Sequence, residues 1–90
     1  MNFQQLRFVI AVADTGSFTR AADRCCVTQP ALSNAISQFE EELGGKLFNR
    51  TTRSVTPTEF GKLIIPDMRN IMEAQSNLIS NASIYNSRDD

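Results

Sequence analysis

The sequence contains no histidine and no tryptophan, and its two cysteines, Cys25 and Cys26, are adjacent. Without histidine, the Ser-His and Cys-His catalytic arrangements are excluded, and so are the zinc sites built from separated cysteine and histidine pairs. Ser17, Ser33 and Cys26 have no histidine to act as their base, so no enzymatic activity is expected. We likewise expect no bound metal and no cofactor.

Long apolar runs are missing as well. No stretch approaches the roughly 18 consecutive apolar residues of a transmembrane helix, and Met1 to Gln5 lacks the charged and apolar regions of a signal peptide. We therefore expect a cytoplasmic protein without membrane contact, whose thiols stay reduced. The 90 residues support one compact core. Because the net charge is −1, any binding site for a polyanion has to be a local patch.

Apolar residues recur at helical spacing from the start of the chain. The first helix is predicted to begin after Asn2, with Gln5 three residues later completing a capping arrangement, and to end at Gly16. Ser17 offers an N-cap oxygen to a second helix of barely two turns. The tight turn Cys26-Val27 then separates this second helix from a third.

The third helix is predicted to begin after Thr28, with Pro30 in its first turn, and to end at Gly44-Gly45. From Gly45 to Pro57 the helical period disappears. Two short segments, 47–49 and 54–56, flank the polar turn Arg50-Thr51-Thr52-Arg53 there, which predicts a small β hairpin.

A long helix is predicted from Thr58 to about Asn81, and the sequence allows it to begin after Thr56 or after Thr58. Pro66 should bend it, and the tail after Asn81 should fray. Its apolar residues alternate steps of three and four, as a coiled-coil seam does, and the stripe is too long for three short helices to cover. We therefore expect a homodimer. The predicted interface residues are Ile64, Ile65, Met68, Ile71, Met72, Gln75, Leu78 and Ile79.

The second and third helices with their tight turn meet the requirements of a helix-turn-helix. A recognition helix enters a major groove about 12 Å wide by its N-terminal end, so its side chains there must be short and able to hydrogen-bond base edges. Thr28 adds a hydroxyl for an adjacent phosphate. The polar face of the third helix is formed by Gln29, Ser33, Asn34, Ser37 and Gln38, of which Gln29, Ser33, Asn34 and Ser37 are predicted to contact DNA.

Positive charge is concentrated on the hairpin. Residues 44 to 62 carry Lys46, Arg50, Arg53 and Lys62 against Glu59 alone. Arg50 and Arg53 at the tip would reach phosphates or a narrow minor groove, so the helix-turn-helix is predicted to be winged. Residues 40 to 42, all glutamate, are either a region kept away from phosphates or simply a solvated face.

The spaced pattern resembles the N-terminal DNA-binding domain of LysR-type transcriptional regulators over about residues 1 to 62. The residues that carry the resemblance are the runs 16–22 (GSFTRAA) and 27–33 (VTQPALS), followed by Ile36, Phe39-Glu40, Glu42-Leu43-Gly44, Leu47-Phe48, Arg50 and Thr58-Glu59-Phe60-Gly61. The fold expected is mainly α: a winged helix-turn-helix (three helices plus a short two-stranded β wing) in residues 1–58, followed by a long linker helix in residues 59–90.

The resemblance implies a bacterial sequence-specific regulator at the nucleoid, whose linker helices pair antiparallel and which binds a pseudo-palindromic duplex. It assigns DNA contacts to Thr28, Gln29, Pro30, Ser33, the following Asn34, and the wing residues Arg50 and Arg53. In that family a small-molecule inducer binds a larger C-terminal domain, so this 90-residue chain is expected to be a DNA-binding fragment without it.

The chain departs from the family pattern at two positions. A basic residue often stands where Asn34 stands, so a phosphate or guanine contact would be lost and a preference for adenine gained. Leucine usually stands where Cys25 stands, and we interpret Cys25 as a small core residue, with a redox sensor as the alternative. A rival interpretation of the whole chain is a protein-interaction module in which the helix-turn-helix is only a scaffold, which the net charge of −1 favours.

Overall fold

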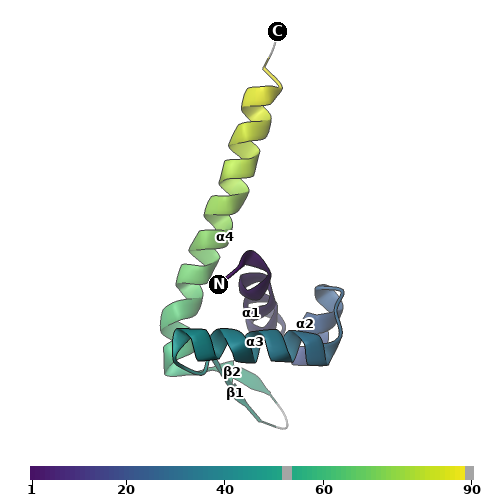
Figure 1. Ribbon diagram of the computed structural model, residues 1–90, viewed down its shortest axis with the longest axis vertical. Helices are drawn as coiled ribbons and strands as arrows, with labels where there is room; N and C mark the ends of the chain where they lie inside the picture. Colours follow the sequence, from purple (N-terminus) through teal and green to yellow (C-terminus); the bar gives the residue numbers. More distant parts are fainter. Residues whose placement is uncertain (52–53, 89–90) are drawn as a thin grey trace.

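A computed structural model of the chain describes residues 1–51 and 54–88. Three helices form a globular part, a two-stranded hairpin projects from it, and a long fourth helix extends away, so that the molecule measures 57 × 26 × 19 Å (Figure 1). The elements are α1 (Phe3–Thr15), α2 (Phe18–Arg24), α3 (Gln29–Leu43), β1 (Phe48–Arg50), β2 (Val55–Pro57) and α4 (Glu59–Asn86). The predicted fold class is confirmed.

The helix ends follow the local signals in the sequence. Asn2 and Gln5 form a capping box, in which the Gln5 amide donates to Asn2 Oδ1 at 2.8 Å. Gly16 ends α1 in the left-handed conformation, with φ 69°, which glycine adopts without strain. The hydroxyls of Ser17, Thr28 and Thr58 cap α2, α3 and α4.

The core lies where α1, α2 and α3 pack together and the start of α4 closes one side. Arg69 on α4 forms an ion pair with Asp14 on α1 at 2.7 Å, which joins these two helices at the surface. The largest fully buried side chains are Leu6, Val9, Val12, Leu32, Ile36, Phe39 and Leu47. No helix in residues 1–51 or 54–88 combines the length and apolar character that crossing a membrane requires.

Glu40 is part of this core, unlike the neighbouring Glu41 and Glu42. Its side chain is 3% exposed, and its carboxylate accepts a hydrogen bond from the Leu47 amide at 2.7 Å. Lys46 Nζ lies 3.9 Å from the second carboxylate oxygen. The interpretation as a solvated face was therefore wrong for Glu40, which holds the loop that leads into β1.

The hairpin pairs Phe48 with Pro57 and Arg50 with Val55, one residue later than the predicted segments 47–49 and 54–56. Gly61 fixes its base. A Cβ at residue 61 would overlap the carbonyl oxygen of Leu47, which accepts a hydrogen bond from the Thr58 amide at 3.0 Å. The start of α4 and the start of β1 therefore approach each other more closely than any side chain would allow.

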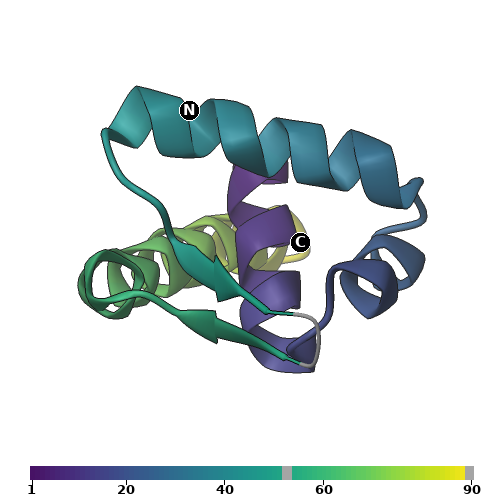
Figure 2. The same ribbon diagram turned by 90° about the horizontal axis from the view of Figure 1, so that it is seen from below.

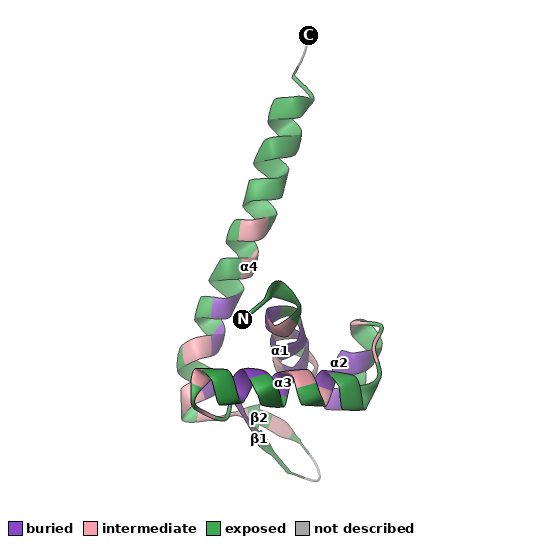
Figure 3. Ribbon diagram, viewed as in Figure 1, coloured by how far each residue is buried: buried purple, intermediate pink, exposed green. Residues whose placement is uncertain are grey.

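The long helix α4 begins after Thr58, which settles the alternative starts, and continues through Pro66 to Asn86. The fraying predicted after Asn81 was wrong. Residues 67–86 contain neither glycine nor proline, and adding one residue to an existing helix costs little. Figure 3 shows that the buried residues of α4 lie in its first half. Gln75 is the last half-buried residue of the helix, and residues 76–86 are all exposed.

The start of the predicted dimer interface also needs correction. Ile65 and Met68 are buried in the core of their own chain, at 5% and 2% exposed, because α1 packs against this part of α4. Ile64 and Met72 are partly buried against the same core. Helical periodicity identified the apolar face correctly, but the face is divided between the core and the exterior.

Candidate nucleic-acid interface

The helix α3 and the hairpin lie at the same end of the molecule, opposite the end where α4 finishes (Figures 1 and 2). One face of α3 is buried in the core, and the opposite face carries the side chains predicted to contact DNA. Ser33 is half-buried beside the hairpin. The exposed members of the set are Thr28, Gln29, Pro30, Asn34 and Ser37.

A groove of about 330 Å³ separates the start of α3 from the hairpin. Gln29 lines it from α3 and Arg50 from β1, so the structure brings together two residues predicted from different elements. The sequence did not single out the other polar groups of the groove as binding residues. They are Ser17, Thr19, Thr51 and Ser54.

Arg50 is the last residue of β1, next to the turn of the hairpin, but its side chain is not free. Its Nη1 donates a hydrogen bond to Ser33 Oγ on α3 at 3.1 Å. Its guanidinium lies over the ring of Phe18 on α2, 4.1 Å from the ring centroid. Arg53, the other predicted wing contact, lies outside the described residues. Arg50 and Ser33, which are 17 positions apart in sequence, are thus in direct contact. No local pattern in the sequence predicts this contact.

Negative charge gathers at the opposite end of α3. Glu42 accepts a hydrogen bond from the N-terminal ammonium at 2.6 Å, and Glu40 is buried under Lys46. The start of α3, where Gln29 and Ser33 lie, has no acidic residue in its first turn. The uncharged N-terminal end of α3 therefore lies beside the wing, and the acidic C-terminal end points away from the wing.

The second half of α4 exposes an apolar groove of about 500 Å³ together with the start of α1. Leu78 and Ile79 are 67% and 59% exposed, and Phe3 at the start of α1 is 43% exposed. Large apolar side chains that adjoin one another in this way are uncommon on a surface that faces only water. The groove is lined by Phe3, Ile71, Ala74, Gln75, Leu78 and Ile79.

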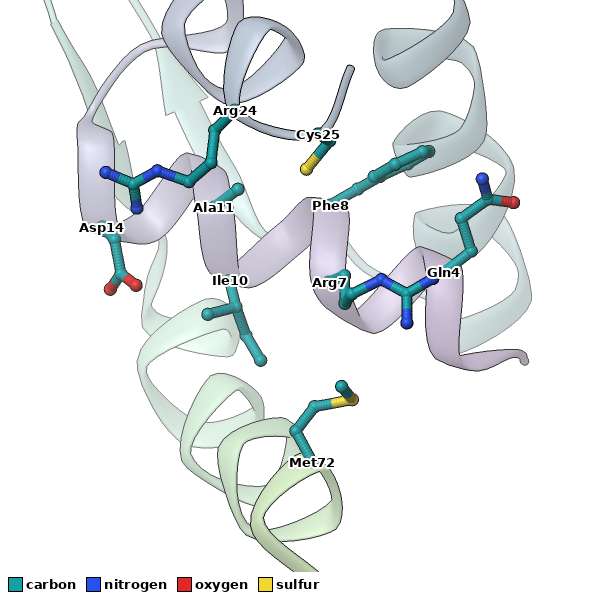
Figure 4. Close-up of a pocket in the computed structure, with 9 residues that line it drawn as sticks. All are labelled: Gln4, Arg7, Phe8, Ile10, Ala11, Asp14, Arg24, Cys25 and Met72. Carbon is teal, nitrogen blue, oxygen red and sulfur yellow. The ribbon is translucent and has the colours of Figure 1, made fainter. Parts of the chain in front are cut away.

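A third groove, of about 460 Å³, lies between α1, α2 and α4. Figure 4 shows the Cys25 thiol directed toward α1, with Met72 on the α4 side. Cys25 packs partly against the core. Burial raises the pKa of this thiol, against the opposing effect of Arg7 and Arg24, and the adjacent Cys26 raises it further.

We expect a thiol reagent to modify Cys26 before Cys25, because Cys26 is exposed and Cys25 is half-buried with a raised pKa. The variants Cys25→Ser and Cys26→Ser, each with one thiol, allow the two rates to be measured separately across pH. Since the folded-state pKa of Cys25 is raised, this thiol favours folding below its ordinary pKa, and that contribution is lost as pH rises through the folded value. Equal rates for the two variants in the folded protein would contradict the assignment.

Three comparisons with known proteins agree with this geometry. Residues 3–62 match the family model for bacterial regulatory helix-turn-helix proteins of the lysR family. The nitrogen assimilation regulatory protein nac of Escherichia coli K12 is 42% identical over 72 residues, which are 80% of this chain and 24% of nac. The chain therefore spans about a quarter of that relative's length.

Solved structures resemble the whole chain. The DNA-binding domain of BenM in complex with benA site 1 DNA matches with a TM-score of 0.92 at 34% identity, over 99% of this chain and 100% of that one. The complex of the CbnR DNA-binding domain with DNA matches with a TM-score of 0.81 at 35% identity, over 93% of this chain and 99% of that one. Since the family model covers residues 3–62, well over half of the chain, the chain belongs to the lysR family of bacterial regulatory helix-turn-helix proteins.

Proposed function

We propose that this chain binds double-stranded DNA sequence-specifically as a homodimer, with α3 in the major groove and the wing on the backbone or in the minor groove. The observation that carries the proposal is the exposed, uncharged, hydrogen-bonding face at the start of α3, beside a wing that carries the local excess of positive charge. A helix is about 10–12 Å across and fits the major groove. The similar BenM and CbnR domains are in complexes with DNA.

Residues 1–58 would contact DNA and residues 59–90 would pair the two protomers. A protein of this kind acts where the bacterial chromosome lies, in the cytoplasm, and needs no catalytic group. The inducer that the family resemblance implies is not assigned to any residue of this chain.

The dimer would pair the exposed stripe of α4 with the same stripe of a second copy, in antiparallel orientation. At residues 61–68 the apolar face of α4 is covered by the chain's own core. In a parallel pair, two globular parts would lie at the same height between the helices and overlap. In an antiparallel pair they lie at opposite ends, and the free stripes around Gln75 and Leu78 meet at the twofold axis.

The division of roles between α3 and the wing predicts two different mutant phenotypes. Gln29→Ala should lose about 1 to 3 kcal/mol of binding at one base pair of each half-site, because its amide reads a base edge. Arg53→Ala should weaken binding to every sequence and flatten the salt dependence by about one unit, because it neutralises a phosphate. Titrations of matched duplexes at several salt concentrations measure both effects. Indistinguishable profiles would contradict the division.

The direct test of the function is selection of duplexes by the full chain from a random pool at fixed salt. We expect a pseudo-palindromic sequence whose half-site spacing reports the dimer geometry. A pool without enriched sequence, and no duplex binding at about 50 mM salt, would favour the rival protein-interaction module.

A further inference from the structure

The contact between Arg50 and Ser33 limits what Ser33 can offer to a ligand. A guanidinium has only donors, so in the 3.1 Å hydrogen bond with Arg50 the Ser33 oxygen must be the acceptor. A serine inside a helix often donates its proton to the carbonyl four residues earlier. Within residues 1–51 and 54–88, the bond from Arg50 is the only one that the Ser33 side chain makes. Its hydroxyl proton is therefore available.

The guanidinium that makes this contact is firmly placed. Phe18, beneath it, is 8% exposed, and its ring meets the ring of Phe48 edge-on, with centroids 6.0 Å apart and an interplanar angle of 81°. The cation therefore lies over a largely buried aromatic ring that packs against a second ring. Because Phe18 lies on α2, Arg50 on β1 and Ser33 on α3, the contact sets the position of the wing relative to the helix that would enter the major groove.

We propose that Arg50 is a positioning residue that makes Ser33 a hydrogen-bond donor to an acceptor on a base edge. The acceptors in the major groove are purine N7, guanine O6 and thymine O4, whereas cytosine presents a donor amino group. A bond from a charged donor also polarises the hydroxyl and strengthens what it donates. This inference rests on the proposed function, and it changes the predicted role of Arg50 from a backbone contact to a residue that acts through Ser33.

The experiment uses the full chain and the duplex that it selects from a random pool. Each purine of one half-site is replaced in turn by its 7-deaza analogue, each guanine also by an analogue without O6, and each thymine by an analogue without O4. We expect one position at which the replacement weakens binding by about 2- to 12-fold beyond its neighbours, the range of one net hydrogen bond. In the Ser33→Ala variant, the analogue at that position should weaken binding by less than about 2-fold, because the hydrogen-bond donor is gone.

Two variants of Arg50 test its part in this contact. In Arg50→Ala the loss at that position should also fall below about 2-fold, while the losses at other positions stay. Arg50→Met keeps apolar packing over Phe18 but donates nothing, so it should behave like Arg50→Ala even if removal of the side chain disturbs folding. Combined with Ser33→Ala, either change should add no further loss at that position, since both act on one contact.

Arg53→Ala is the control, because it removes a positive charge from the same hairpin and is expected to weaken binding to every sequence. It should lower affinity for all duplexes and leave the position-specific loss intact. If Arg50→Met does the same, Arg50 is a charge contact only and the inference is wrong. If Ser33→Ala keeps every position-specific loss, Ser33 does not read the base and the inference is also wrong. Failure to select any duplex would instead overturn the proposed function itself, and this inference with it.

Discussion

Replacing Gly61 with alanine should destabilise the protein by about 3 kcal/mol or more, as expected when atoms are forced into a packed site that cannot relax. The new Cβ would overlap the carbonyl oxygen of Leu47. That oxygen cannot retreat easily, because Leu47 is fully buried and its carbonyl accepts the Thr58 amide at 3.0 Å. The loss is large beside the roughly 5 to 15 kcal/mol that stabilises a typical domain.

Urea unfolding followed by circular dichroism would measure this loss, with Gly45→Ala as the matched control. A Cβ at residue 45 would also come close to a neighbour, at 2.9 Å, but the neighbour is the ring of Phe60, a side chain that can rotate aside. We expect the control to lose about 1 kcal/mol or less. Equal losses in the two variants would show that the approach of α4 to β1 is not the constraint described here.

Leu78→Glu should convert the proposed dimer to a monomer. Leu78 is 67% exposed in the single chain, so the change leaves the folded protomer intact. In the antiparallel pair it would lie near the twofold axis, where two added carboxylates would be desolvated and would repel each other. Because the two DNA-binding domains are then no longer joined, binding to a duplex with two half-sites should fall by about 100-fold or more.

Leu63→Glu is the control, since Leu63 is on the same helix and 70% exposed but does not line the apolar groove. Sedimentation equilibrium should report a monomer for Leu78→Glu and a dimer for Leu63→Glu. Binding of Leu78→Glu to a duplex with a single half-site should change little. A dimeric Leu78→Glu would place the protomer contact elsewhere.

The elements of this fold could be predicted because their signals are local. Asn2, Ser17 and Thr28 cap helices by bonding to amides three residues away, and Gly16 ends α1 by its own backbone conformation. Such effects depend only on neighbours in the chain. The polar start of α3 and the basic hairpin could be identified for the same reason, and the structure places them at one end of the molecule.

Other features depend on which segments meet in space. Glu40 resembles Glu41 and Glu42 in sequence, yet only Glu40 reaches the Leu47 amide and is buried. Ile65 and Leu78 belong to one apolar stripe, but α1 covers the first and leaves the second exposed. Periodicity predicts that one face of a helix is apolar, but it does not predict which segment covers that face.

The same limit applies at the candidate site. The letters of the chain were enough to establish that it is built from helices with these ends, that α3 carries hydrogen-bonding groups and that the hairpin carries positive charge. Only the tertiary structure shows that Arg50 contacts Ser33 and Phe18. It also shows that the apolar face of α4 is partly in the core and partly exposed. Backbone conformation is governed by residues a few positions apart, whereas a side chain's partner is chosen only when distant segments are packed against each other.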